Sequence, residues 1–147
     1  MNKGYTILNL KVKARFFENF SMVGLILFAV KGKGIAYSNF STGNEADIFN
    51  LCFIGANTQI GKGCLINTGA QIHHEVEIRD FSEVNPGAVL LGKVKIGSFC
   101  SIGANATILP KVKIGNNVVV GAGSVVTQDV PDGVTVVGVP GKIILKA

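Results

Sequence analysis

This chain of 147 residues has no tryptophan, only two tyrosines and few charged residues. Charged residues make up 16% of the sequence, whereas a typical globular domain has about a quarter. A low charge content together with 19 glycines suggests either repetitive β structure or burial against partner subunits. The length is that of one ordinary domain.

A long apolar run is also missing. The longest one, MVGLILFAV at residues 22–30, is shorter than the roughly 20 residues that span a bilayer. The segment before it contains Glu18 and no small-residue cleavage site, unlike a signal peptide. We therefore expect a cytoplasmic protein without membrane contact. Basic runs with interleaved aromatic residues are absent as well, which argues against nucleic acid, although a net charge of +5 favours an anionic partner.

The chain does have a repeat of six residues. From Phe53 it divides without a gap into thirteen hexads: FIGANT, QIGKGC, LINTGA, QIHHEV, EIRDFS, EVNPGA, VLLGKV, KIGSFC, SIGANA, TILPKV, KIGNNV, VVGAGS and VVTQDV. The second residue of every hexad is aliphatic, and the sixth is Thr, Cys, Ala, Val or Ser. A helix would scatter this period around its circumference. Uninterrupted hexads predict a parallel β-helix, which is an all-β fold.

In such a β-helix three hexads form one triangular coil of eighteen residues, so residues eighteen apart are stacked neighbours, about 4.8 Å from each other. The aliphatic second residue fills the interior, and the small sixth residue fits beneath the bend. Cys64 and Cys100 take this sixth position two coils apart, which is about 10 Å and too far for a disulfide. We expect them, and Cys52 in the same phase, to be buried free thiols.

The repeat weakens towards both ends of the chain. Residues 35–52, IAYSNF STGNEA DIFNLC, fit one further irregular coil, whereas residues 1–34 contain no hexads. We expect a short N-terminal cap over 1–34 and the β-helix domain over 35–147, because the open end of a repeat stack needs a cap. In the C-terminal tail, Pro140 and Gly141 predict a turn before a last short strand or helix.

The third residue of each hexad begins the bend and is often glycine, which suggests a positive φ at that position. Five consecutive hexads depart from glycine there, with Asn67, His73, Arg79, Asn85 and Leu91. A cluster of departures indicates either a functional surface or a tolerant corner of the coil.

His74 lies in one of these bends, and Gly92 follows it by eighteen residues. The stacking therefore places a bare backbone about 5 Å from His74. Acyl transfer needs a base for the attacking group and a hydrogen-bond donor for the developing oxyanion, and these two residues supply both. Glu75, next to His74, is placed to hold the imidazole in one tautomer.

Three longer segments follow one another in order: INTGAQIHHEVEIRDF, PGAVLLGKVKIG and VVVGAGSVVTQDVPDGVTVVGVPGKII. In order and spacing they resemble the sugar O- and N-acetyltransferases of the hexapeptide-repeat class, namely the sialic-acid O-acetyltransferases and the acetyltransferases of nucleotide-linked 4-amino sugars. The resemblance covers residues 53–145. It implies a left-handed β-helix and a homotrimer that binds acetyl-CoA in the groove between adjacent subunits, with a sugar or a sugar nucleotide as acceptor.

The resemblance also implies roles for single residues. His74 would be the general base and Glu75 the carboxylate that orients it. Gly92 would contact the acetyl thioester through its N–H, and Asn67 and His73 would lie near the sugar. No metal is implied, and the CoA groove would be lined by Gly92, Ala104, Ala122 and Lys142.

Two positions depart from the pattern of this family. The second histidine that many members carry in the stretch FSEVNPG is Glu83 here, and the acidic residue that often precedes the base is His73. We expect His74 rather than His73 to act as the base. These enzymes usually carry an N-terminal domain that binds the nucleotide sugar, and we expect residues 1–34 to be too short for one.

Four lysines form two pairs eighteen residues apart, Lys93 with Lys111 and Lys95 with Lys113. Stacked like charges repel each other. The phosphates of CoA would relieve this repulsion, and a solvated surface is the alternative interpretation.

The sequence thus favours an acetyl-CoA-dependent acetyltransferase in which His74 activates a sugar hydroxyl or amine for direct attack on the thioester. The alternative is a non-catalytic trimeric β-helix module that lacks its sugar-binding domain. A zinc enzyme, another use of this fold, needs three well-spaced ligands, whereas the two histidines here are adjacent.

Overall fold

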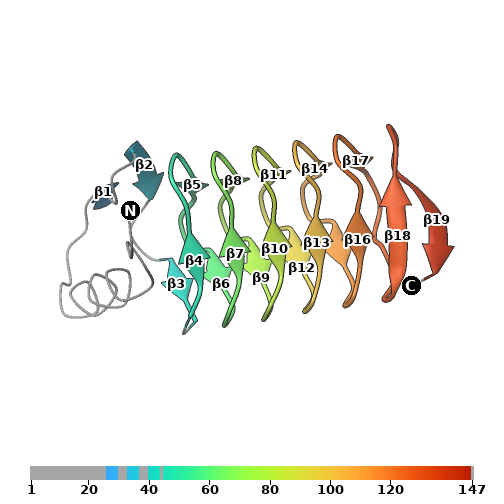
Figure 1. Ribbon diagram of the computed structural model, residues 1–147, viewed down its shortest axis with the longest axis horizontal. Coiled ribbons are helices and arrows are strands. Elements are labelled where there is room, and N and C mark those ends of the chain that lie inside the picture. The colour runs from blue at the N-terminus through green and yellow to red at the C-terminus, as the bar shows by residue number, and fades with distance from the viewer. Residues whose placement is uncertain (1–25, 30–32, 37–39, 44, 147) are drawn as a thin grey trace, which may run out of the picture.

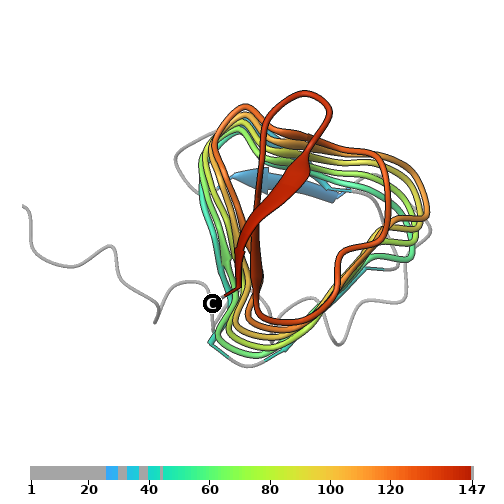
Figure 2. The same cartoon turned by 90° about the vertical axis from the view of Figure 1, so that its right-hand side faces the viewer.

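The computed structural model describes residues 26–29, 33–36, 40–43 and 45–146, which form a three-sided prism with one sheet on each side (Figures 1 and 2). Sheet A has seven strands, β1 (Ile26–Ala29), β2 (Lys33–Ala36), β5 (Phe53–Ile54), β8 (Gln71–Ile72), β11 (Val89–Leu90), β14 (Thr107–Ile108) and β17 (Val125–Val126). Sheet B has five, β3 (Ser41–Thr42), β6 (Gln59–Ile60), β9 (Glu77–Ile78), β12 (Lys95–Ile96) and β15 (Lys113–Ile114). Sheet C has seven, β4 (Asp47–Ile48), β7 (Leu65–Ile66), β10 (Glu83–Val84), β13 (Ser101–Ile102), β16 (Val119–Val120), β18 (Val134–Val137) and β19 (Lys142–Lys146).

The register of these sheets is the predicted one. From β2 to β17 the parallel partners are eighteen residues apart, as Gln71 with Val89 in sheet A and Lys95 with Lys113 in sheet B. The last parallel pair, β16 with β18, has an offset of sixteen. The predicted fold class, a left-handed parallel β-helix of hexapeptide repeats, is confirmed. In the part of the chain that is described, no helix is long and apolar enough to cross a membrane.

The interior of the prism is filled by the second and sixth residues of the hexads. All thirteen second-position side chains, from Ile54 to Val126, are buried, and so are all thirteen sixth-position ones, from Thr58 to Val130. Even the few polar groups among them have partners: Thr58 Oγ1, for example, donates to the carbonyl of His73 at 2.9 Å. The repeat therefore gives a closely packed core with satisfied hydrogen bonds.

The glycines at the third position have a different cause from the one expected. The third-position residues among those described have ordinary φ angles, and the positive φ lies at the fifth position, as in Glu75 (59°) and Lys93 (65°). A Cβ on Gly55 would lie 2.6 Å from the backbone N of His74 in the coil above. Glycine at the third position thus allows close stacking of coils, and the prediction of a positive φ there was wrong.

The first coil and the C-terminal tail also follow the sequence. The described residues between 35 and 52 fit the predicted irregular coil, since β2, β3 and β4 pair with β5, β6 and β7 at the same offset. β18 adds one parallel strand to sheet C, and the predicted turn at Pro140 and Gly141 leads into β19, which is antiparallel to β18. The cap expected over residues 1–34 falls mostly outside the described residues, of which β1 and β2 form an antiparallel pair, and it stays a prediction.

The cysteines are free and buried, as expected. Cys64 Sγ donates to the Arg79 carbonyl at 3.1 Å, and Cys100 Sγ to the Gly115 carbonyl at 2.9 Å. Burial raises the pKa of the thiols of Cys52, Cys64 and Cys100 above its ordinary value. A neutral, enclosed thiol is a poor nucleophile, so these side chains are structural.

This burial predicts the reaction of the protein with a thiol reagent at about pH 8, where an exposed cysteine is partly ionised. Native protein should stay unlabelled during the time in which free cysteine reacts completely, and unfolded protein should take up three labels, counted by mass spectrometry. Rapid labelling of any cysteine in the native state would contradict the structural role.

Candidate active site

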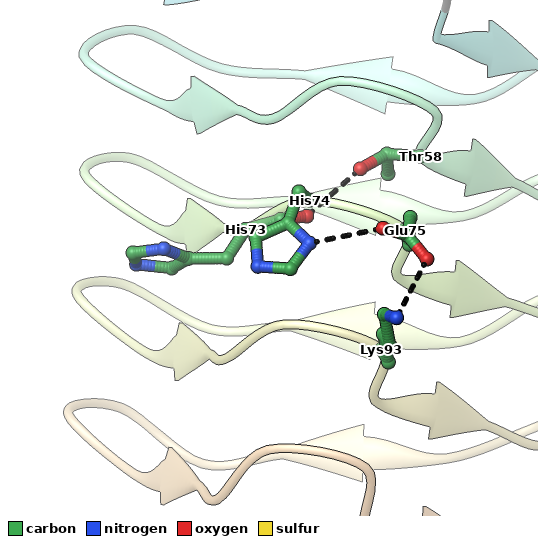
Figure 3. Close-up of polar contacts among 5 residues, drawn as sticks. All are labelled: Thr58, His73, His74, Glu75 and Lys93. Atoms are coloured by element: carbon green, nitrogen blue, oxygen red, sulfur yellow. Dashed lines mark hydrogen bonds and ion pairs between the residues drawn. The ribbon is translucent and has the colours of Figure 1, made fainter.

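The two histidines lie in a bend, residues 73–76, at the corner between sheets A and B. The imidazole and the carboxylate of the next residue are neighbours, with His74 Nδ1 and Glu75 Oε1 3.4 Å apart (Figure 3). Both side chains are largely in solvent, with 59% and 47% exposed. The corner therefore presents a histidine whose Nδ1 faces a carboxylate and whose Nε2 is left for another partner.

Gly92 lies in the coil above, next to His74, as the eighteen-residue stacking predicted. The Lys93 N–H donates to the His74 carbonyl at 3.0 Å, which fixes the two bends against each other. The imidazole of His74 lies so close to Gly92 that a Cβ there would overlap Nε2, the nearest ring atom, and would lie 2.6 Å from Cε1. A side chain at this position would displace the ring, so glycine allows the observed contact.

The amide N–H of Gly92 has no acceptor among the described residues. At two bends the amide of the same hexad position is satisfied by a side chain one coil above: Lys62 N–H donates to Asp80 Oδ1 at 2.8 Å, and Ser98 N–H donates to Asn116 Oδ1 at 2.9 Å. The amides of Ala56 and Ala104, like that of Gly92, have no acceptor among the described residues. Above Gly92 the corresponding residue is Pro110, whose side chain accepts no hydrogen bond. The Gly92 amide is thus open to an acceptor on a ligand.

A lysine from the coil of Gly92 also lies at this corner. Lys93 Nζ lies 3.3 Å from Glu75 Oε2, the carboxylate oxygen that does not face His74. The Lys93 ammonium, followed by the His74 side chain, holds the pKa of the Glu75 carboxyl below its ordinary value. From the sequence, Lys93 was expected to stack beneath Lys111. The same offset of eighteen residues also places Lys93 above Glu75, so this ion pair could have been predicted as well.

The ion pairs change the interpretation of the four lysines. Lys93 and Lys95 are each paired with a glutamate from the coil below, the latter with Glu77 at 2.9 Å. Lys111 and Lys113 form no ion pair with the residues that the structure describes. Of these four lysines, only Lys111 and Lys113 therefore carry a charge that is not part of an ion pair among the described residues.

His73 is held differently from His74. Its ring lies against Phe53 in the coil below, with centroids 5.5 Å apart, and its carbonyl accepts the hydrogen bond from Thr58. The two imidazoles point in different directions (Figure 3). His73 is half-buried in an aromatic contact, so the histidine that meets Gly92 is His74.

The other residues expected at the site lie elsewhere on the prism. Asn67, Ala104 and Ala122 are in bends at the corner between sheets C and A, and Lys142 begins β19. Asn67 Oδ1 accepts the N–H of Thr68 at 3.0 Å. One chain thus brings His73, His74, Glu75 and Gly92 together but leaves the remaining candidates on another corner or strand.

Comparison with known proteins relates this geometry to chemistry. Residues 93–128 match the bacterial transferase hexapeptide family (six repeats), and no curated protein matches the sequence. The fold is similar to that of GDP-perosamine N-acetyltransferase from Caulobacter crescentus, solved as a histidine-to-alanine variant with CoA and GDP-perosamine. That similarity has a TM-score of 0.77 and 31% identity over 94% of this chain and 63% of the Caulobacter chain.

The acetyltransferase domain of PglB from Neisseria gonorrhoeae FA1090, solved with acetyl coenzyme A, is similar at a TM-score of 0.63 and 27% identity, over 92% of this chain and 67% of that one. AntD, an N-acyltransferase from Bacillus cereus, shares the fold at 23% identity and a TM-score of 0.69, over 77% of this chain and 80% of that one. The resemblance to the hexapeptide-repeat sugar acetyltransferases is thereby confirmed. The chain spans less than two thirds of the length of the Caulobacter enzyme.

The contact between Gly92 and the imidazole can be tested directly. Because a Cβ would overlap the ring, Gly92→Ala should displace His74, which we expect to change the histidine signals in a ¹⁵N–¹H NMR spectrum. Ser98→Ala, at the same hexad position of another corner, should leave these signals in place. A spectrum of Gly92→Ala identical to that of the unmodified protein would contradict the contact.

Proposed function

We propose that this protein transfers the acetyl group of acetyl-CoA to a hydroxyl or amine of a sugar or of a nucleotide-linked amino sugar. The observation that carries the proposal is the contact of the His74 imidazole with Gly92, whose amide is open to a ligand. CoA or acetyl-CoA in the Caulobacter and Neisseria structures supports the co-substrate, and GDP-perosamine in the former supports a sugar-nucleotide acceptor.

The residues suggest a direct transfer. In the tautomer that carries its proton on Nδ1, His74 donates to Glu75, which leaves Nε2 to remove the proton of the acceptor hydroxyl or amine. The acceptor atom bonds to the thioester carbon, and the Gly92 N–H donates to the oxygen on which negative charge develops. The carbon–sulfur bond then breaks, and the CoA sulfur takes the proton from the imidazolium. No covalent enzyme intermediate is needed, and the three buried thiols supply no accessible nucleophile.

A homotrimer would complete this site. Asn67, Ala104 and Ala122 lie on a different corner of the prism from His74, so in a groove between subunits they would come from the neighbouring copy. Lys142, exposed at the start of β19, would approach the phosphates of CoA. A cytoplasmic location agrees with acetyl-CoA as the co-substrate.

Replacement of the proposed base gives the first test. His74→Ala should lower kcat for acetyl transfer by on the order of 10² or more, because a positioned general base contributes about that factor. Binding of CoA, measured by calorimetry, should persist. Acceptors are screened among amino sugars and their nucleotide conjugates with a thiol-detecting assay for released CoA.

His73→Ala is the matched control. It should retain most of kcat because its ring lies against Phe53, and any loss should appear in KM for the acceptor, near which the family resemblance places His73. Near-normal turnover of His74→Ala would rule out the mechanism. Failure of the unmodified protein to bind CoA at all would favour a non-catalytic β-helix module.

The role of the Gly92 amide can be tested without altering Gly92. Asn and Asp at the hexad position of Pro110 capture the amide one coil below, as Asn116 does for Ser98. Pro110→Asn should therefore occupy the Gly92 N–H and lower kcat at least about tenfold, since loss of one oxyanion donor costs 10²- to 10³-fold in known enzymes. Steady-state kinetics give the result.

Pro110→Ala is the control for this substitution, because it removes the proline without supplying an acceptor. It should keep nearly full activity. Equal losses in both variants would show that the proline ring matters rather than the open amide.

A further inference from the structure

The fifth residue of every third hexad lies at the corner between sheets A and B, and these residues form a column along that corner. It contains Asn57, Glu75, Lys93 and Lys111 from four successive coils. The fifth residue of the last hexad at this corner is Asp129, which accepts the Lys113 N–H at 2.8 Å. Backbone hydrogen bonds fix their spacing: Glu75 N–H donates to the Ala56 carbonyl at 2.9 Å, and Lys111 N–H donates to the Gly92 carbonyl at 3.0 Å. Opposite charges therefore lie directly above one another at the level of His74.

Lys93 contacts both members of the His74–Glu75 pair. Its backbone N–H donates to the His74 carbonyl at 3.0 Å, and its ammonium lies 3.3 Å from Glu75 Oε2. The other carboxylate oxygen, Oε1, faces His74 Nδ1. Lys93 thus contacts the backbone of His74 and one oxygen of the Glu75 carboxylate, whose other oxygen faces the imidazole.

The neighbours of Lys93 in the column reinforce this arrangement. Lys111 lies above Lys93 with the same charge, and repulsion between stacked like charges favours the ammonium pointing down towards Glu75. Asn57, below Glu75, carries no charge. The charged groups that face Glu75 are therefore Lys93 from the coil above and His74 from its own bend.

An exposed ion pair of this kind contributes little to folding stability, because solvent screens it. It can still restrict the rotamers of a side chain that would otherwise move freely in water. Glu75 is 47% exposed and has only a 3.4 Å contact with His74. Its orientation towards the imidazole therefore depends on a second anchor.

We propose that Lys93 is a positioning residue, which holds Glu75 by Oε2 so that Oε1 stays directed at His74 Nδ1. As far as catalysis is concerned, this rests on the acetyl transfer proposed above. Lys93 acts through Glu75 and touches neither acceptor nor thioester. Replacement of Lys93 should therefore lower the rate of the chemical step and leave the binding of CoA unchanged.

The experiment compares Lys93→Met with Lys95→Met. The control removes the ion pair with Glu77, which has the same chemistry and similar exposure but no contact with a histidine. The first measurement needs no activity: the carboxyl signal of Glu75 is titrated by ¹³C NMR in each variant. We expect the Glu75 midpoint to rise towards its ordinary value in Lys93→Met and to stay unchanged in Lys95→Met.

The second measurement is steady-state kinetics. Lys93→Met should lower kcat about tenfold, the order expected from a misplaced catalytic group, with KM for acetyl-CoA unchanged within about twofold. Lys93→Arg, which keeps the charge, should restore most of kcat, and Lys95→Met should match the unmodified protein. A rise in KM with kcat unchanged, or equal decreases of kcat in the Lys93→Met and Lys95→Met variants, would overturn the proposal.

The two proposals fail in distinguishable ways. If the unmodified protein transfers no acetyl group, the proposed function is wrong, and the titration of Glu75 alone decides whether Lys93 anchors the carboxylate. If transfer occurs but the Glu75 midpoint is the same with and without Lys93, the positioning role is wrong and the enzyme activity stands.

Discussion

The backbone hydrogen bonds between successive coils are the constraint on which the rest of the structure depends. Each bend donates to the coil above or below at a fixed offset, as His73 N–H does to the Leu90 carbonyl at 2.9 Å. Residues eighteen apart therefore form columns along the prism, and a column fixes which side chains meet. The candidate site is a product of two adjacent columns, His74 below Gly92 and Glu75 below Lys93.

The six-residue period of the sequence is sufficient to predict the core residues and the neighbours in adjacent coils. Aliphatic residues at the second position and small ones at the sixth placed the core correctly, because each position meets the same interior in every coil. The neighbourhood of His74 and Gly92 followed from the same offset. The irregular coil over 35–52 was also predictable, since β2, β3 and β4 keep the register although their side chains depart from the pattern.

The features that were missed depend on contacts between coils in three dimensions. Glycine at the third position suggested a positive φ, whereas Gly55 is glycine because the backbone of His74 lies against it. The positive φ falls instead on residues such as Glu75 and Lys93, where the sequence shows no glycine. The roles of Asn67, Ala104 and Ala122 stay predictions, because they concern a corner that one chain does not bring to His74.

The antiparallel strand β19 has a consequence for the edge of sheet C that it forms. A stack of parallel coils exposes unpaired backbone groups at its last turn, and another prism could add there and continue the ladder into a fibre. β19 reverses the chain direction against β18, with an irregular register between Thr135 and Val136. In sheet C the outermost strand thus no longer matches the direction of an incoming coil, so the C-terminal hairpin limits end-to-end polymerisation on that side.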